Sequence, residues 1–262
     1  MPAVRVGSVL VPHGLFLAPM AGVSDAPFRS LCKKYGAEYT VSEMISAKAL
    51  CYEQNGRAAA PVRTAPLAEI DGGSAPMALQ LFGSEPEFLA RAAVLLESGT
   101  YRGFRSALAP AAIDINMGCP VEKVVRNGEG SALLANFPLA ERIISACKKS
   151  GKTVSVKFRI GLERGKTFAA EFAKLCEGAG ADLLTVHGRT RDMYYAGEPD
   201  YAQIAAAKNA VRIPVVANGG IFTRADAQAM LEKTGADGVM VARAAMYDPH
   251  VFAEMLGGER EW

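Results

Sequence analysis

The chain has 262 residues, of which 50% are hydrophobic and 21% are charged, and its formal net charge is +2. This length suits one large core or two small ones, and the composition is that of an ordinary globular protein. No uninterrupted apolar stretch reaches the length of a bilayer span, which excludes a membrane-spanning segment. The near-neutral charge neither implies nor excludes a nucleic-acid partner, because a local basic patch can lie within a balanced total.

The N-terminus and the cysteines indicate the compartment. The segment MPAVRVGSVLVPHG has no basic stretch followed by a long apolar run, so it predicts no signal peptide. The cysteines are odd in number and lack CxxC spacing; they are Cys32, Cys51, Cys119, Cys147 and Cys176. Free thiols in a reducing compartment fit this pattern better than a disulfide framework or a zinc site. We therefore expect a cytoplasmic protein with no metal and no membrane association.

Short apolar runs alternate with longer helical patterns along the chain, which is typical of βα units and a parallel sheet. Strands are expected at residues 15–18, 38–42, 77–82, 112–116, 154–158, 182–187, 214–217 and 238–242. The helices between them carry start signals. These are the capping pairs Ser84 with Glu87 and Thr223 with Asp226, the N-cap Asn136, and Asp248 before Pro249 at the start of a final helix over 248–257.

Three segments of the chain resemble one another: GAEYTV at Gly36, GADLLTV at Gly180 and GADGVMV at Gly235. In each, a glycine ends a helix and an acidic residue precedes an apolar strand, as expected when similar βα units stack around a ring. Eight strands in this order favour a (β/α)8 TIM barrel over a doubly wound sheet. The barrel is expected over about 15–247 of a single domain spanning 1–262. No GxGxxG follows the first strand, which weakens the dinucleotide-binding alternative.

In such barrels the site is built at the carboxyl ends of the strands. Polar residues or glycines stand at the predicted ends after the first, and the full set is Pro19, Met20 and Ala21; Glu43; Gln80; Asn116 and Cys119; Lys157 and Arg159; His187 and Arg189; Asn218, Gly219 and Gly220; Ala242 and Arg243. Each has an ordinary explanation by itself, such as a solvated strand end for Lys157 or a hydrogen-bonded core histidine for His187. Their convergence on one rim predicts a functional site.

The last two strand ends suggest a phosphate site. The segment NGGIFTRAD places glycine N–H donors just before the helix that begins near Thr223, and Arg243 follows the final strand. Loops after strands 7 and 8 are the recurrent phosphate site of this fold, and a guanidinium fork with a helix dipole suits a dianion. The alternative is a helix cap plus a surface arginine.

A further unusual stretch is DINMGCPVEKVVRNGEG, from Asp114 to Gly130, which begins as a strand and opens into a glycine-punctuated loop carrying Cys119. Taken alone it suits a tight turn with an incidental thiol. Together with PMAGVSDAPFR, VKFRIG, HGRTR, NGGI and ARA in this order, however, DINMGCP resembles the tRNA-dihydrouridine synthases. These are flavoenzymes on a TIM barrel, and the resemblance extends over about 16–252.

The resemblance implies FMN in the barrel mouth, reduction by NADPH, and reduction of a uridine C5–C6 double bond in tRNA. By position, it assigns cofactor binding to Pro19, Met20, Ala21, Gln80, Lys157, His187, Asn218, Gly219, Gly220, Ala242 and Arg243. Lys157 would stabilise the negative charge of the reduced ring, and Gly219, Gly220 and Arg243 would hold the phosphate. Asn116, Arg159 and Arg189 would contact the substrate.

The same resemblance gives Cys119 a catalytic role. Hydride transfer from the flavin to C6 of uracil leaves negative charge at C5, and a thiol on a loop facing the flavin would supply the proton as a general acid. For this it must stay protonated at neutral pH, so the pKa of a free thiol is suitable and a strongly lowered pKa would be counterproductive. The other four cysteines fall on predicted helices and are interpreted as packing residues.

The sequence departs from the family pattern at several positions. Ala242 replaces a glycine before Arg243, Met193 replaces a glutamine after HGRTR, and Leu162 replaces a tryptophan after VKFRIG. Residues 101–110 look like an insertion. Family members usually continue into a helical C-terminal domain that grips tRNA, so a chain ending at Trp262 is expected either to come from a truncation or to have lost that domain, and to bind tRNA weakly.

Two alternatives stay open from the sequence. The first is another FMN barrel that acts on a free pyrimidine, as dihydroorotate dehydrogenase does. The second is a flavin- or RNA-binding remnant without activity. The NMGCP loop disfavours the first, and the joint presence of Cys119, Lys157 and His187 disfavours the second.

Overall fold

The computed structural model describes residues 1–56, 64–70, 72–74, 76–101, 104–105 and 108–258. Eight parallel strands pair in a closed ring in the order β3, β4, β6, β9, β10, β13, β14 and β15. They are β3 (Leu15–Leu17), β4 (Tyr39–Val41), β6 (Met77–Phe82), β9 (Ala112–Met117), β10 (Val154–Arg159), β13 (Leu183–His187), β14 (Val215–Asn218) and β15 (Gly238–Val241). The predicted (β/α)8 barrel and its eight strands are therefore confirmed, each end to within one residue.

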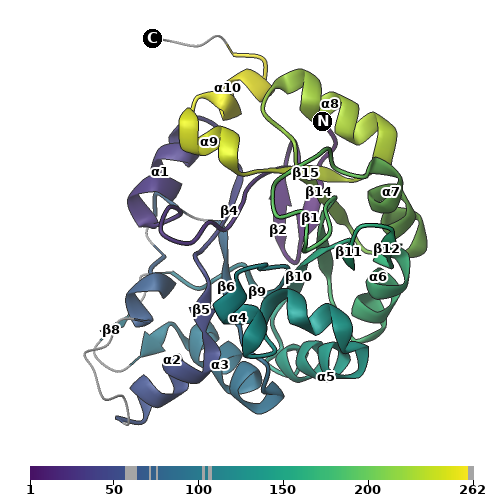
Figure 1. The fold of residues 1–262 in the computed structure, drawn as a ribbon. Helices are drawn as coiled ribbons and strands as arrows, with labels where there is room; N and C mark the ends of the chain where they lie inside the picture. Colours follow the sequence, from purple (N-terminus) through teal and green to yellow (C-terminus); the bar gives the residue numbers. More distant parts are fainter. Residues whose placement is uncertain (57–63, 71, 75, 102–103, 106–107, 259–262) are drawn as a thin grey trace.

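A ring of helices surrounds the strands (Figure 1). The helices are α1 (Ala26–Lys34), α2 (Ala47–Gln54), α3 (Pro86–Ser98), α4 (Glu122–Arg126), α5 (Phe137–Lys148), α6 (Ala169–Gly178), α7 (Tyr201–Ala210), α8 (Arg224–Thr234), α9 (Arg243–Tyr247) and α10 (Val251–Met255). Two 3-10 turns, η1 (Ala65–Ala68) and η2 (Gly130–Ala135), lie between them. In α5 the buried residues Ala140, Ile143, Ile144 and Cys147 follow helical spacing, which is why this segment packs one face on the barrel.

Inside the barrel, alternate strand residues form a buried hydrophobic cluster that includes Phe16, Tyr39 and Val216. Val4, Val6 and Val11 of the hairpin β1 (Val4–Val6) and β2 (Val9–Val11) belong to the same cluster. Val4 of this hairpin approaches Gly238 at the beginning of β15, and Pro2 just before it approaches Gly14 before β3, so the segment closes the N-terminal end of the barrel. The cavity described below lies at the opposite end.

Two helix starts follow the sequence prediction. The Thr223 side chain and Asp226 form the expected capping box of α8, and the Asn136 side chain accepts from Leu139 N at the start of α5. Cys32, Cys51, Cys147 and Cys176 are buried on α1, α2, α5 and α6, which confirms their interpretation as packing residues.

Two helix starts were predicted wrongly. Helix α3 begins at Pro86 with Glu85 at the N-cap, and Ser84 instead donates its hydroxyl hydrogen to Asn127 O. A proline favours the first helical position because its missing N–H needs no partner there, and this moves the cap one residue along. The final helix is Val251–Met255 rather than 248–257, because the Asp248 carboxylate accepts from His250 N and holds a turn before it.

Further short strands lie outside the ring of eight strands. They are β5 (Ile45–Ser46), β7 (Thr100–Tyr101), β8 (Phe104–Arg105), β11 (Gly161–Glu163) and β12 (Lys166–Thr167). Strands β7 and β8 pair antiparallel within the segment interpreted as an insertion, of which 102–103 and 106–107 lie outside the described residues. Among the helices of the described residues, none is both long and apolar enough to cross a membrane.

Candidate active site

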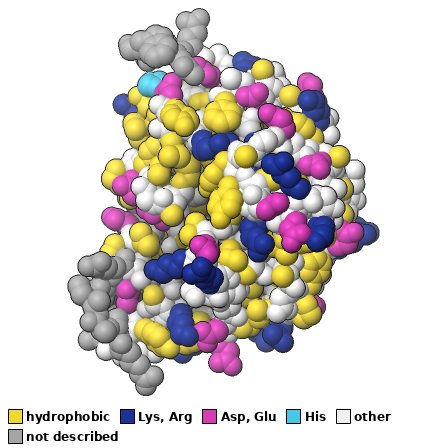
Figure 2. Space-filling model, viewed as in Figure 1, with side chains coloured by type: hydrophobic (Ala, Val, Ile, Leu, Met, Phe, Trp, Pro, Cys, Tyr) yellow, Lys and Arg dark blue, Asp and Glu magenta, His cyan; other side chains and the backbone are white. Residues whose placement is uncertain are grey.

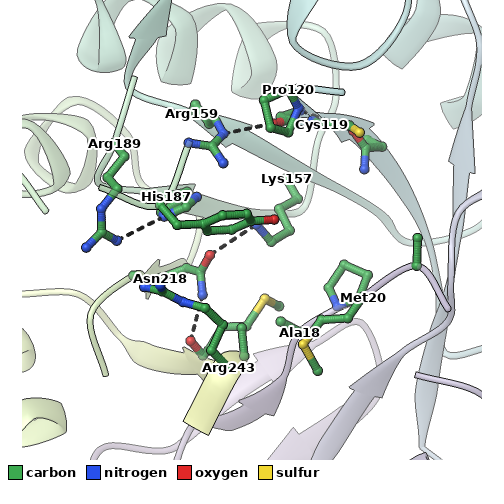
Figure 3. Close-up of a pocket in the computed structure, with 18 of the residues that line it drawn as sticks. Ala18, Met20, Cys119, Pro120, Lys157, Arg159, His187, Arg189, Asn218 and Arg243 are labelled. Carbon is green, nitrogen blue, oxygen red and sulfur yellow. Dashed lines mark hydrogen bonds between the residues drawn. The ribbon is translucent and has the colours of Figure 1, made fainter. Parts of the chain in front are cut away.

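A cavity of about 440 Å³ opens at the carboxyl ends of the barrel strands (Figure 3). All fifteen residues that the sequence assigned to cofactor, substrate or catalysis line it: Pro19, Met20, Ala21, Gln80, Asn116, Cys119, Lys157, Arg159, His187, Arg189, Asn218, Gly219, Gly220, Ala242 and Arg243. Glu43, also expected at the rim, does not line the cavity; its carboxylate accepts from Gly22 N. One site therefore collects residues from strands spread over more than 200 positions of sequence.

Basic side chains dominate one wall of the cavity. Lys157 Nζ donates to Asn218 Oδ1 over 3.1 Å, and burial, aided by the charge of Arg159, lowers the pKa of Lys157 to about 8. His187 is buried, and burial beside Arg159, Lys157 and Arg189 holds its pKa well below the usual value. His187 is thus neutral at pH 7, and its Nε2 faces Arg189 Nη1 at 3.4 Å, which makes Nε2 the acceptor because a guanidinium only donates.

Arg159 and Arg189 hold loops at the cavity wall. Arg159 Nε donates to Gly118 O over 2.9 Å and its Nη1 donates to Thr190 O and Tyr194 O, so it ties the Cys119 loop to the loop after β13. Burial lowers the pKa of Arg159 to about 10, which leaves it charged at pH 7. Arg189 donates to Gly197 O through Nη2 at 2.6 Å. Both guanidinium groups are therefore anchored by backbone carbonyls in addition to facing the cavity.

Cys119 lies on the loop between β9 and α4. Its N–H and that of Gly118 donate to Asn116 Oδ1, at 2.9 and 3.2 Å, and its carbonyl accepts from Ser131 N. Gly130 has φ +59°, and a Cβ there would lie 2.9 Å from Cys119 O, so only glycine fits. Burial raises the pKa of the Cys119 thiol, although nearby Arg159 and Lys157 oppose the shift. The sulfur therefore carries its proton at neutral pH.

The amide of Gln80 is already engaged within the protein. Its Nε2 donates to Asp114 Oδ2 at 2.7 Å, and its Oε1 accepts from Asn116 Nδ2 at 2.8 Å. No role was predicted for Asp114 from the sequence. A signal was available, because an acidic residue two positions before Asn116 on a buried strand must point the same way into the barrel.

The opposite end of the cavity presents free donors. Gly219 and Gly220 have φ +116° and +69°, and a Cβ at Gly219 would lie 2.8 Å from His187 Cδ2. Within the described parts of the chain, neither glycine N–H has a hydrogen-bond acceptor. The Arg243 guanidinium lies 5.1 Å from the ring of Tyr195 and 5.3 Å from that of Phe222. An anionic group at this position would meet N–H donors and a cation together.

Two aromatic residues at the cavity edge were not predicted from the sequence. Tyr195 and Phe222 are exposed, line the cavity, and stand on loops without a periodic pattern, so no sequence signal marked them.

On the face viewed in Figure 2, hydrophobic side chains gather with Lys and Arg side chains among them. Within the described residues, no group of three or more His, Cys, Asp and Glu side chains could hold a metal ion.

The comparison with known families decides the classification. The family model described as Dihydrouridine synthase (Dus) matches residues 16–260. The chain belongs to the dihydrouridine synthase family. It is therefore a member of a family of oxidoreductase enzymes, as its sequence motifs predicted.

Relatives of this dihydrouridine synthase-family chain support the assignment. It is 39% identical over 256 residues to tRNA-dihydrouridine synthase B of Pseudomonas aeruginosa, covering 97% of this chain and 72% of the relative. It is 38% identical over 253 residues to a probable tRNA-dihydrouridine synthase of Rickettsia bellii, covering 96% and 73%. The likeness extends over nearly the whole of this chain in both cases.

Two solved structures share the fold at low identity. One is a complex of 2-naphthoyl-CoA reductase with 2-naphthoyl-CoA, with a TM-score of 0.69 at 12% identity over 97% of this chain and 51% of that one. The other is a variant of morphinone reductase in complex with tetrahydroNAD, with a TM-score of 0.63 at 13% identity over 98% and 90%. At these identities the likeness shows the barrel fold alone.

Proposed function

We propose that this protein reduces a uridine of tRNA to 5,6-dihydrouridine, with FMN bound in the cavity and NADPH as the reductant. The observation that carries the proposal is the Cys119 thiol, protonated at neutral pH and with its backbone N–H held by Asn116, at a cavity that Lys157 and Arg243 also line. Family membership and the names of the curated relatives support the substrate class.

The residues present fit FMN. The cavity of about 440 Å³ lies within the usual range for cofactor sites. The unused N–H groups of Gly219 and Gly220, with Arg243 beside them, suit a phosphate. Ala242, where the family has glycine, has a φ of −125°, so no left-handed backbone requires a glycine at this position.

The cavity residues divide the binding between them. In this proposal Gly219, Gly220 and Arg243 hold the phosphate, while Pro19, Met20 and Ala21 line the flavin ring. His187 is neutral and adds no charge, whereas Lys157 offers a buried cation to the reduced ring. When bound, FMN supplies the hydride that C6 of uridine accepts. The barrel over 15–247 is thus assigned both binding and chemistry.

Cys119 supplies the proton. Its Sγ–H bond breaks as the proton passes to C5 of the uracil, and the thiolate that remains takes a proton from solvent. Burial favours the neutral thiol before transfer, and the charges of Arg159 and Lys157 stabilise the thiolate after it. The side chain thus suits a general acid. Asn116, Arg159 and Arg189 also line the cavity and are assigned to the substrate in this proposal.

The test compares substrates. We expect purified protein to show a flavin spectrum and to form dihydrouridine in unmodified tRNA when NADPH is added, detected by mass spectrometry of nucleosides. Free uridine and orotate should give no comparable product. A protein that takes up no FMN, or that reduces orotate in preference to tRNA, would contradict the proposal.

A further inference from the structure

Asp114 is a buried carboxylate beneath the cavity. It stands in the middle of β9, is 3% exposed, and does not line the cavity itself. Its register neighbours are Gln80 on β6 and Ser155 on β10, so the three side chains point to the same inner face of the barrel. Burying a carboxylate costs stability unless hydrogen bonds compensate, so its partners matter.

A chain of hydrogen bonds runs from Asp114 to the Cys119 loop. Gln80 Nε2 donates to Asp114 Oδ2 at 2.7 Å, and Asn116 Nδ2 donates to Gln80 Oε1 at 2.8 Å. Asn116 Oδ1 then accepts from the N–H of Cys119 at 2.9 Å and from that of Gly118 at 3.2 Å. Three hydrogen bonds in series therefore join a group outside the cavity to the backbone of the proposed general acid.

The donors and acceptors in this chain permit one arrangement. An amide side chain can present its oxygen or its NH2 group in either of two positions, whereas an ionised carboxylate only accepts and a backbone N–H only donates. Asp114 therefore requires the NH2 group of Gln80, which leaves the Gln80 oxygen for Asn116. The Asn116 oxygen is then left for the loop. Each group in the chain thus has its orientation fixed from both ends.

We infer that Asp114 is a positioning residue that fixes the Cys119 loop through Gln80 and Asn116. Its importance for catalysis rests on the proposed function, in which the Cys119 thiol must meet C5 of the uracil. A misplacement of about 1 Å at such a group costs about 10²-fold in rate. Because Asp114 acts on the Cys119 loop, its effect can be measured in the absence of substrate.

Ser155 provides a matched control. Its Oγ donates to Asp114 Oδ1 at 2.5 Å, so it shares the carboxylate and the burial but lies off the path to Cys119. Ser155→Ala removes one hydrogen bond from Asp114 and leaves the links to Gln80 and Asn116 intact. Asp114→Leu keeps a similar shape and removes both acceptor oxygens.

The measurement is the alkylation rate of Cys119 in the FMN-saturated protein. Cys119 is the one cysteine of the chain that is not buried, so iodoacetamide labels it selectively, and peptide mass spectrometry follows it. In Asp114→Leu the loop loses its anchor and the thiol becomes more exposed, so labelling should accelerate about fivefold, the factor of one ordinary hydrogen bond. Ser155→Ala should label at the wild-type rate. If Asp114→Leu fails to fold, Gln80→Met breaks the same path and should accelerate labelling likewise.

A double-mutant cycle separates positioning from general destabilisation. In an Asn116→Ala background the path is already cut, so adding Asp114→Leu, or Gln80→Met in its place, should leave labelling unchanged. An equal acceleration in both backgrounds, or wild-type labelling in a folded single variant, would overturn the inference. A wild-type protein that forms no dihydrouridine would refute the proposed function instead, and the labelling cycle would still decide the role of Asp114.

Discussion

At the residue scale, burial shifts the pKa values of ionisable groups at the cavity. Lys157, His187 and Asp114 all lie in or beneath the cavity, and burial is the largest cause of the pKa shift in each. Burial disfavours charge, so it lowers the pKa of the lysine and the histidine and raises that of the carboxylate. Shifts of this kind gather at sites that do chemistry.

Substitution of Arg243 tests the proposed phosphate site. We expect Arg243→Ala to weaken FMN binding by about 1.5–3 kcal/mol, the value of a charge-assisted hydrogen bond, or about 10-fold to 10²-fold in Kd. Fluorescence titration of flavin-free protein with FMN measures it. Arg224→Ala is the matched control, because Arg224 opens α8 without lining the cavity. Equal dissociation constants for the two variants would mean that the phosphate does not bind at Arg243.

The buried carboxyl group of Asp114 should make the free energy of unfolding depend on pH. Burial raises its pKa from 3.8 to about 6, against hydrogen bonds from Ser155 and Gln80. The folded state therefore holds a proton that the unfolded state has lost between about pH 4 and 6, so rising pH destabilises the fold in that window. Asp114→Asn removes this effect. The free energy of unfolding of the variant minus that of wild type should rise by on the order of 3 kcal/mol from pH 4 to 7.

Urea unfolding of flavin-free protein at pH 4, 5, 6 and 7 measures this difference. Asp192 serves as the control with the opposite sign, because a hydrogen bond from Thr190 lowers the pKa of this exposed carboxylate. The stability it contributes is present at neutral pH and is lost as pH falls, so Asp192→Asn should fall behind wild type as pH rises. A flat difference for Asp114→Asn would show that the carboxylate is not desolvated.

At the element scale, strands and capped helices could be predicted because their signals are local. The residues of β9 and β10 are almost all buried apolar or inward-facing polar groups, and α8 carries both halves of a capping box. The errors came where a neighbour changed the outcome. Pro86 moved the start of α3, and the Asp248 carboxylate held a turn where a helix was expected. Sequence patterns do not show which of two competing local interactions forms.

The two predicted caps differ in a measurable way. Asn136→Ala should lower the free energy of unfolding by about 1 kcal/mol, because the Asn136 side chain accepts from Leu139 N at the start of α5. Ser84→Ala should change it by less than about 0.5 kcal/mol, because Ser84 caps no helix and its hydroxyl is exposed. Chemical denaturation of both variants checks the difference. A cost at Ser84 equal to that at Asn136 would contradict the assigned helix starts.

At the scale of the whole molecule, the barrel explains why the residues of the candidate site could be predicted from the sequence. Parallel strands around a ring bring their carboxyl ends to one rim, so residues distant in sequence, such as Met20 and Arg243, line one cavity. The contacts between them could not be predicted. The link from Arg159 to Gly118 O and the path from Asp114 to Cys119 depend on side-chain orientations that only the packed structure fixes.

The most direct measurement separates the two half-reactions of the proposed enzyme with Cys119→Ala. FMN affinity and the rate of flavin reduction by NADPH should stay near wild type, because the thiol serves only the pyrimidine. Dihydrouridine formation in unmodified tRNA should fall by about 10²–10⁴-fold, the usual contribution of a positioned general acid. A variant that forms dihydrouridine at the wild-type rate would contradict the role of Cys119 and reduce it to a thiol in a turn.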